Sequence, residues 1–136
     1  MRVVRLARRR WEVRAICSDD GAVLVLDGLR GKNGEKQILS LLLETVPNYG
    51  PQVDNPSICK PLKPVSDGLW ELRKQPRRGP KPRVIWFKDG DAVVVCTHGF
   101  VKDQAKTPRG EIELARKLKR EYFETRPTVE ELSDES

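Results

Sequence analysis

Two apolar runs joined by an Asp-Gly turn constrain the fold of this chain more than any other feature. Residues 83–87 (RVIWF) and 92–97 (AVVVCT) are short and rich in β-branched and aromatic side chains, and residues 88–91 (KDGD) separate them. Asp-Gly suits the tight turn of a β-hairpin, because the central residues of that turn need positive φ angles. The sequence therefore predicts an antiparallel hairpin whose second strand is buried.

Three further segments have the character of strands. Residues 11–16 place apolar side chains on one face and Glu12 and Arg14 on the other. Residues 69–74 alternate as a strand does, with Leu69, Glu71 and Arg73 on one face and the other three side chains on the opposite face. Residues 59–64 contain two prolines, which lack the backbone N–H that a central strand needs. We expect that last segment to run along an edge of the sheet.

Helical patterns occupy two other regions. Within residues 35–46 the apolar side chains recur at steps of three and four, and the Pro-Asn-Tyr-Gly-Pro sequence of residues 47–51 ends the pattern. A second helix is predicted after Thr107 as its N-cap and Pro108 at its first position, with one apolar face formed by Ile112, Ala115, Leu118 and Tyr122. Periodicity alone leaves residues 22–29 ambiguous between strand and helix.

Charge divides the chain into a basic body and an acidic end. Its 136 residues fit one domain, expected over residues 1–126, and carry a net charge of +6. Residues 124–136 hold five acids and one base, so the remaining 25 bases and 15 acids leave the body at +10. This excess favours a polyanionic partner, although a solvated charged surface would look the same. Residues 1–10 are expected to form a basic arm and residues 127–136 a disordered tail.

The cysteine content argues against a disulfide or zinc framework. The three cysteines, Cys17, Cys59 and Cys96, are widely spaced, and the chain has one histidine. We therefore expect free thiols, buried at Cys17 and Cys96, a reducing compartment and no metal or other cofactor. No apolar run approaches the length that spans a membrane, so a cytoplasmic protein without a membrane partner is expected.

Five short motifs carry a resemblance to a known family. They are GLWELR at residues 68–73, RVIWF at 83–87, HGFVK at 98–102, KTP at 106–108 and EIELA at 111–115. In this combination the chain resembles the RelE/HigB-like toxins of type II toxin–antitoxin systems, in the phage-derived, HigB-type branch of the RelE/ParE superfamily. It departs from the family pattern at Asp103, where a second lysine is common, and at Pro82, where an aromatic residue is usual.

The resemblance implies both a fold and a function. The fold is α+β: a small antiparallel sheet of about four strands, two N-terminal helices packed on one face, residues 22–29 in the first of them, and a C-terminal helix. The implied function is a toxin that cleaves messenger RNA, commonly on the ribosome, and that a cognate antitoxin of helix-turn-helix type holds inactive. Cleavage by attack of the RNA 2′-hydroxyl needs a base, an acid and cations around the phosphate, but no metal.

The residues expected to perform this chemistry lie in the matching motifs. Arg73 and Arg83 should face each other across adjacent strands as phosphate clamps, and Lys102 and Lys106 should bind phosphate or transfer protons. His98, just beyond the predicted strand, could be the acid or base, or could hydrogen-bond the loop. The alternatives for the cations are an ion pair of Arg73 with Glu71 and solvated loop charge for the lysines. Further RNA contacts are expected from Lys63, Arg77, Arg78 and Lys81.

Two other functions remain open from the sequence. The first is a toxin of the same fold that poisons DNA gyrase without cutting RNA, because fold alone does not determine function. The second is a non-catalytic RNA-binding module, suggested by the acidic Asp103. The two tryptophans of the motifs, Trp70 and Trp86, are expected in the core rather than under RNA bases.

Overall fold

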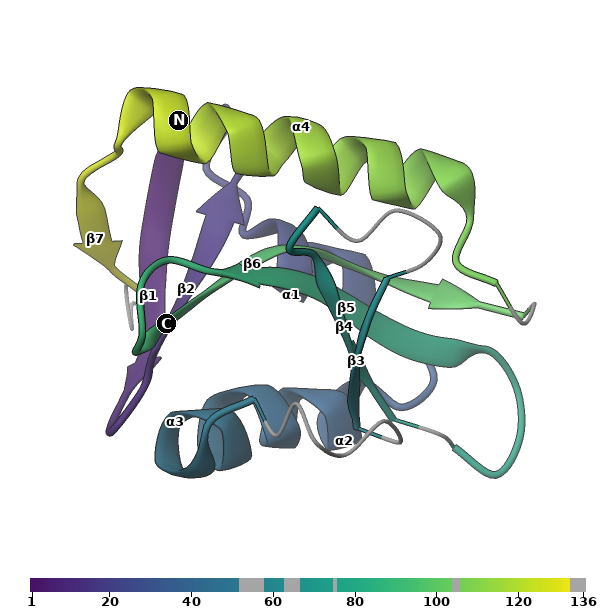
Figure 1. Cartoon of the computed structure of the whole chain (residues 1–136). Helices are drawn as coiled ribbons and strands as arrows, with labels where there is room; N and C mark the ends of the chain where they lie inside the picture. Colours follow the sequence, from purple (N-terminus) through teal and green to yellow (C-terminus); the bar gives the residue numbers. More distant parts are fainter. Residues whose placement is uncertain (52–57, 63–66, 75, 104–105, 133–136) are drawn as a thin grey trace.

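A computed structural model describes residues 1–51, 58–62, 67–74, 76–103 and 106–132. One mixed sheet runs through the molecule with helices on both of its faces (Figure 1). Across the sheet the strand order is β3-β4-β5-β6-β2-β1-β7. The strands are β1 (Arg2–Arg8), β2 (Glu12–Cys17), β3 (Cys59–Pro61), β4 (Trp70–Arg73), β5 (Lys81–Lys88), β6 (Val93–Lys102) and β7 (Val129–Glu131).

Three helices cover the sheet. They are α1 (Leu24–Leu29), a continuous helix made of α2 (Glu35–Ser40), the π-helical η1 (Leu41–Thr45) and α3 (Val46–Tyr49), and α4 (Arg109–Thr125). The first two pack on one face, where Leu29 and Ile38 join a buried cluster with Trp86. Helix α4 lies along the opposite face and packs Leu118 against Phe87 and its neighbours (Figure 1).

The α+β class and the two N-terminal helices on one face are confirmed, whereas the expected sheet of about four antiparallel strands is wrong. The sheet has seven strands, and β2 pairs with β6, and β1 with β7, in parallel. The hairpin of β5 and β6, the edge position of β3 and the helix at residues 24–29 agree with the sequence predictions.

The additional strands come from the two ends of the chain. The segment expected as a basic arm forms β1, in which Val3 and Val4 are buried. Residues 129–131, expected within a disordered tail, form β7, and Glu130 pairs with Arg2 while Glu131 pairs with Arg5. The acidic end therefore neutralises part of the basic start.

Strand β6 extends further than the sequence pattern indicated. The apolar run suggested an end near residue 97, but the strand continues to Lys102, with an irregularity in its pairing with β5 between Ile85 and Trp86. His98 and Lys102 are consequently strand residues on the sheet face that α4 covers, rather than loop residues beyond a rim.

Candidate functional site

A buried carboxylate gathers the cations of three adjacent strands. Glu71 of β4 is fully buried, and its Oε1 lies 3.2 Å from Arg83 Nε of β5 and 3.6 Å from Lys102 Nζ of β6. Arg73 is the direct partner of Arg83 in the β4–β5 register, and it is close enough to influence the pKa of both Arg83 and Lys102. We call Glu71, Arg73, Arg83 and Lys102 the Glu71 cluster.

The cluster holds more positive than negative charge. Within these four residues three cations accompany one carboxylate, so their formal charges sum to +2. Burial lowers the pKa of Lys102 most strongly, Glu71 opposes that shift, and Arg83, Lys60 and Arg73 reinforce it. Such an excess in a partly dehydrated place favours the binding of an anion.

Backbone carbonyls hold the Arg83 side chain in place. Its Nη1 donates to the carbonyl of Lys74 at 3.0 Å and to that of Pro82 at 2.8 Å. Burial lowers the pKa of Arg83, and the neighbouring Glu71 carboxylate acts in the opposite direction. Only 1% of Arg83 is exposed, so the structure places it beneath the surface and not on it.

Thr107 connects the cluster to the start of α4. Its hydroxyl donates to Glu71 Oε2 and accepts a hydrogen bond of 3.3 Å from Lys102 Nζ. The expectation that Thr107 caps α4 is wrong, because Pro108 occupies the N-cap position. The hydroxyl instead contacts side chains of the sheet, where the buried Glu71 carboxylate needs a hydrogen-bond donor.

His98 lies on the same sheet face but has different partners. It is 5% exposed, its Nδ1 lies 3.0 Å from the Thr97 hydroxyl, and its Nε2 lies 3.4 Å from Glu111 Oε1 of α4. Burial lowers the pKa of His98, and Glu111 opposes the shift. The ring also stacks on Phe100 at 5.5 Å, so His98 joins β6 to α4.

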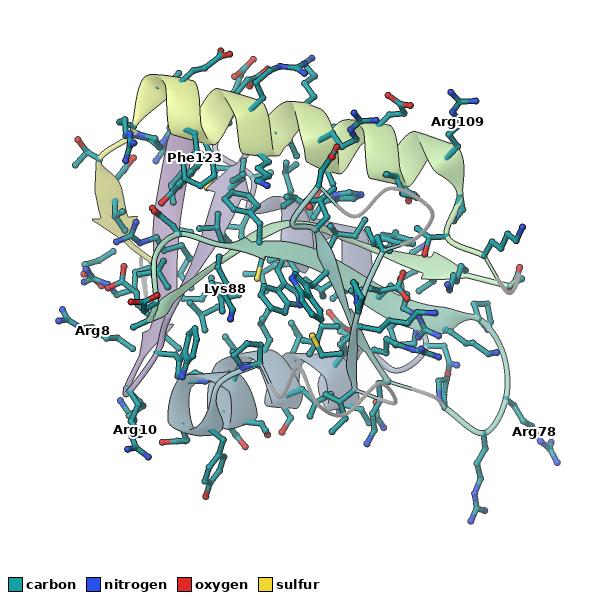
Figure 2. All side chains as sticks on the ribbon, viewed as in Figure 1. Arg8, Arg10, Arg78, Lys88, Arg109 and Phe123 are labelled. Atoms are coloured by element: carbon teal, nitrogen blue, oxygen red, sulfur yellow. The ribbon has the colours of Figure 1, made fainter. Side chains whose placement is uncertain are left out.

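The other cations predicted for RNA are more exposed. Arg77 and Arg78 are exposed in the β4–β5 connection, Lys81 is half-buried at the start of β5, and Lys106 is exposed ahead of α4. Figure 2 shows Arg78 pointing away from the fold at one end of the molecule. Lys63 lies outside the described residues.

Sequence reasoning missed three members of this neighbourhood: Glu71 as its centre, Thr107 as its hydroxyl, and Lys60. Glu71 lies two residues after Leu69 and therefore on the same face of the strand. Because Leu69 is fully buried, its position on that face was the available signal for a buried acid. Lys60 of β3 lies directly opposite Glu71 of β4 in the register of these two antiparallel strands. A pairing between separate strands could not be read from local spacing.

Two expectations about non-catalytic residues are confirmed. Trp86 is 1% exposed and stacks on Trp70 with ring centroids 5.7 Å apart, so this pair belongs to the core. All three cysteines are free and buried.

In the described part of the chain, no group of three or more His, Cys, Asp or Glu side chains is placed to hold a metal ion. No helix in this part combines the length and apolar character needed to cross a membrane.

A model of a known protein family matches most of the chain. The family model described as phage derived protein Gp49-like (DUF891) matches residues 32–120, roughly two thirds of the chain. The matched range contains the whole Glu71 cluster and most of α4. No curated protein matches the chain.

Proposed function

This chain belongs to the phage-derived Gp49-like family, and we propose that it is the toxin of a toxin–antitoxin pair, an endoribonuclease that cuts messenger RNA on the ribosome. The observation that carries the proposal is the convergence of Arg73, Arg83 and Lys102 around Glu71, with a net excess of positive charge. A cleavable phosphate is the anion that such a cluster suits best.

The burial of the cations assigns them different tasks. Arg73 is the half-buried member of the cluster, and Lys106, four residues after Lys102, is exposed. These two side chains therefore make the first contacts with the phosphate. Arg83 and Lys102 lie beneath and stabilise the charge that develops on phosphorus. Glu71 is a positioning residue that fixes both buried cations.

Proton transfer falls to Lys102 in this proposal. The lowered pKa of Lys102 brings its ammonium closer to the range in which a lysine exchanges protons. As the acid, Lys102 would give a proton to the leaving 5′ oxygen, while the Thr107 hydroxyl, which accepts from Lys102 and donates to Glu71, holds the ammonium in position. His98 is bound between Thr97 and Glu111, and we assign it a role in holding α4.

The partner in this proposal is an antitoxin of helix-turn-helix type that supplies carboxylates to the excess positive charge. A surface of one sign that binds RNA is blocked most directly by acidic side chains of complementary shape. Action on translating ribosomes would place the toxin in the cytoplasm.

Primer extension on messenger RNA, in a purified translation reaction with and without ribosomes, tests the proposal. We expect cuts that require ribosomes, and a loss of about 100- to 1000-fold in rate for Arg73→Ala and Lys102→Met. Arg10→Ala is the matched control, because Arg10 is exposed at the β1–β2 turn, away from the cluster (Figure 2), and should cut normally.

Intact messenger with the wild-type protein would overturn the proposal. A supercoiling assay would then test gyrase poisoning, and RNA binding without cleavage would indicate a non-catalytic module. Circular dichroism of each variant must match the wild type, because Lys102 is only 6% exposed.

A further inference from the structure

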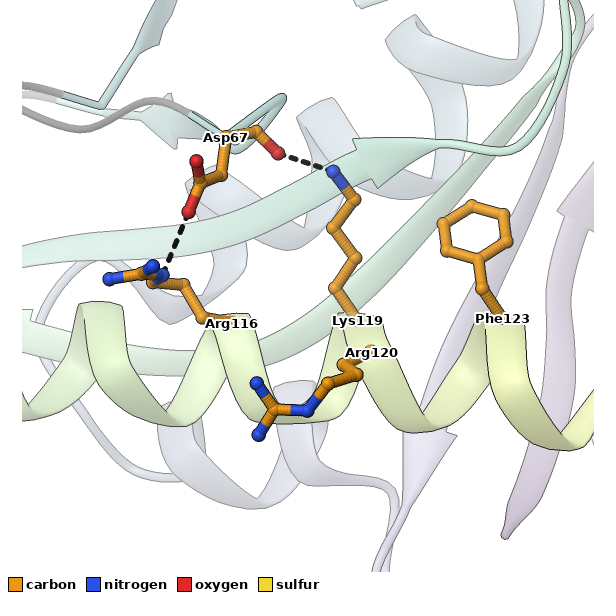
Figure 3. Close-up of a pocket in the computed structure, with 5 residues that line it drawn as sticks. All are labelled: Asp67, Arg116, Lys119, Arg120 and Phe123. Carbon is orange, nitrogen blue, oxygen red and sulfur yellow. Dashed lines mark hydrogen bonds and ion pairs between the residues drawn. The ribbon is translucent and has the colours of Figure 1, made fainter.

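A hollow of about 230 Å³ lies between α4 and the Asp67–Gly68 turn that precedes β4 (Figure 3). Three cations and an aromatic ring line it, together with the turn itself. The lining residues are Asp67, Arg116, Lys119, Arg120 and Phe123. None of them belongs to the Glu71 cluster.

Two of these cations fasten the turn to the helix. Arg116 Nε contacts the Asp67 carboxylate at 2.8 Å, and Lys119 donates to the Asp67 carbonyl. Gly68 leaves room for Lys119, because a Cβ at Gly68 would lie 2.8 Å from its Nζ. The walls of the hollow are therefore held in place by contacts within the chain.

The Arg120 side chain does not connect the Asp67–Gly68 turn to the helix. Arg120 is exposed, and its side chain forms no hydrogen bond or ion pair with any residue that the structure describes. In Figure 3 its guanidinium points away from the Asp67 turn, towards the open side of α4. A planar guanidinium in this position can bind a phosphate through two parallel N–H donors.

Phe123 forms the aromatic end of the hollow. Its ring is half-buried, packs against Phe87 at 5.4 Å between centroids, and has the Arg126 guanidinium 6.0 Å away. An aromatic ring beside cations is the arrangement on which proteins stack the bases of single-stranded nucleic acids.

The cationic surface continues beyond this hollow. A second hollow of about 430 Å³ shares Arg116 and Arg120 with the first and adds Lys117, together with Glu113 and Leu114. Arg116 and Arg120 are four residues apart, so they are separated by about 6 Å along the helix axis. Together they form a ridge along the exposed side of α4 with a hollow on either side.

We propose that this ridge and the hollow at Asp67 bind single-stranded RNA, with one base on Phe123 and a phosphate on Arg120. A nucleobase brings N–H donors that the Asp67 carboxylate can accept, whereas the side chains of an acidic peptide bring none. The inference rests on the proposed function for its choice of RNA. It adds a binding subsite on α4 and the turn before β4, and the Glu71 cluster includes two residues of β4 and is linked to the start of α4 through Thr107.

Fluorescence anisotropy with a labelled single-stranded RNA tests this subsite without cleavage, if the 2′-hydroxyls of that RNA are methylated. Arg120→Ala should weaken binding and reduce the slope of log affinity against log salt by about 0.7. Phe123→Leu, which keeps an apolar side chain, should weaken binding by about 5- to 150-fold. Arg109→Ala is the matched control on the same helix, since Arg109 is exposed but pairs with Glu113.

The outcomes separate this inference from the proposed function. If the wild type cuts no messenger but binds RNA in an Arg120-dependent way, the subsite stands and the nuclease proposal fails. If Arg120→Ala and Arg109→Ala bind RNA equally well, the subsite is wrong whatever the cleavage result. Displacement of the RNA by polyglutamate at equal charge concentration would also overturn it, in favour of an acidic protein partner.

Discussion

Replacing Glu71 by Gln should destabilise the protein more than any change to its surface charges. The substitution keeps the shape and an oxygen that can accept from Thr107, but removes the charge 3.2 Å from Arg83 and 3.6 Å from Lys102. At an effective dielectric constant of about 20, each attraction is about 5 kcal/mol before dehydration costs. Since those costs are already met in the fold, removing the charge of Glu71 from beside two buried cations should cost about 3–5 kcal/mol.

Urea unfolding at pH 7 measures this difference directly. A total stability of about 5–15 kcal/mol makes the expected loss a large fraction of the whole. Glu113→Gln is the matched control, because its partner Arg109 is exposed and such a pair contributes about 1 kcal/mol or less. A loss below about 1 kcal/mol for Glu71→Gln would refute the view that this carboxylate holds the cluster together. Adding Lys102→Met should restore part of the stability, since one of the two buried cations that face position 71 is then gone.

Three further predictions concern other parts of the fold. Burial lowers the pKa of His98, so the folded protein binds fewer protons there than the unfolded chain, and unfolding free energy should fall as the pH drops below about 6.5. Urea titrations at pH 7 and 5 should show a smaller fall for His98→Gln, and equal falls would contradict the assignment. Tyr122→Phe removes a buried hydroxyl with hydrogen bonds of 2.7 and 2.6 Å and should cost about 1–3 kcal/mol in thermal unfolding, whereas Tyr49→Phe, at an exposed position, should cost nothing measurable. Gly28→Ala would put a Cβ 1.9 Å from a β6 carbonyl oxygen and should lower the free energy of unfolding by at least about 1–3 kcal/mol. Gly110→Ala, in open space on α4, should raise it by up to about 1 kcal/mol. Similar melting temperatures for the two variants would be contrary to the packing described.

The local elements of the fold were predictable because their signals are local. Alternation, the Asp89-Gly90 turn and the helical spacing after Pro108 each reflect neighbours in sequence. The parallel pairings of β2 with β6 and of β1 with β7 join distant segments, and no short pattern encodes them. Strand β1 was misread because its arginines resemble a solvated arm, although Glu130 and Glu131 at the other end of the chain pair with them.

The candidate site was predictable in its cations and not in its organisation. The motifs pointed to Arg73, Arg83 and Lys102, and the structure brings these three residues together. The burial of Arg83 and Lys102 could not be foreseen, because it depends on Glu71 meeting them across two strand pairings. A charged residue is seldom fully buried unless it is paired, so the buried Glu71 carboxylate explains why Arg83 and Lys102 are buried.

The two departures from the family pattern leave the Glu71 cluster intact. Asp103 is exposed, while its neighbour Lys102 is buried and directed at Glu71, so the acid at position 103 does not replace a cation of the cluster. Pro82 lacks an N–H, but its carbonyl accepts from Arg83 and so helps to fix that guanidinium. A degenerate site would be expected to lose the residues that pair with the buried cations and hold them in position. Here those residues are present, and this favours a working cationic site over an inactive remnant.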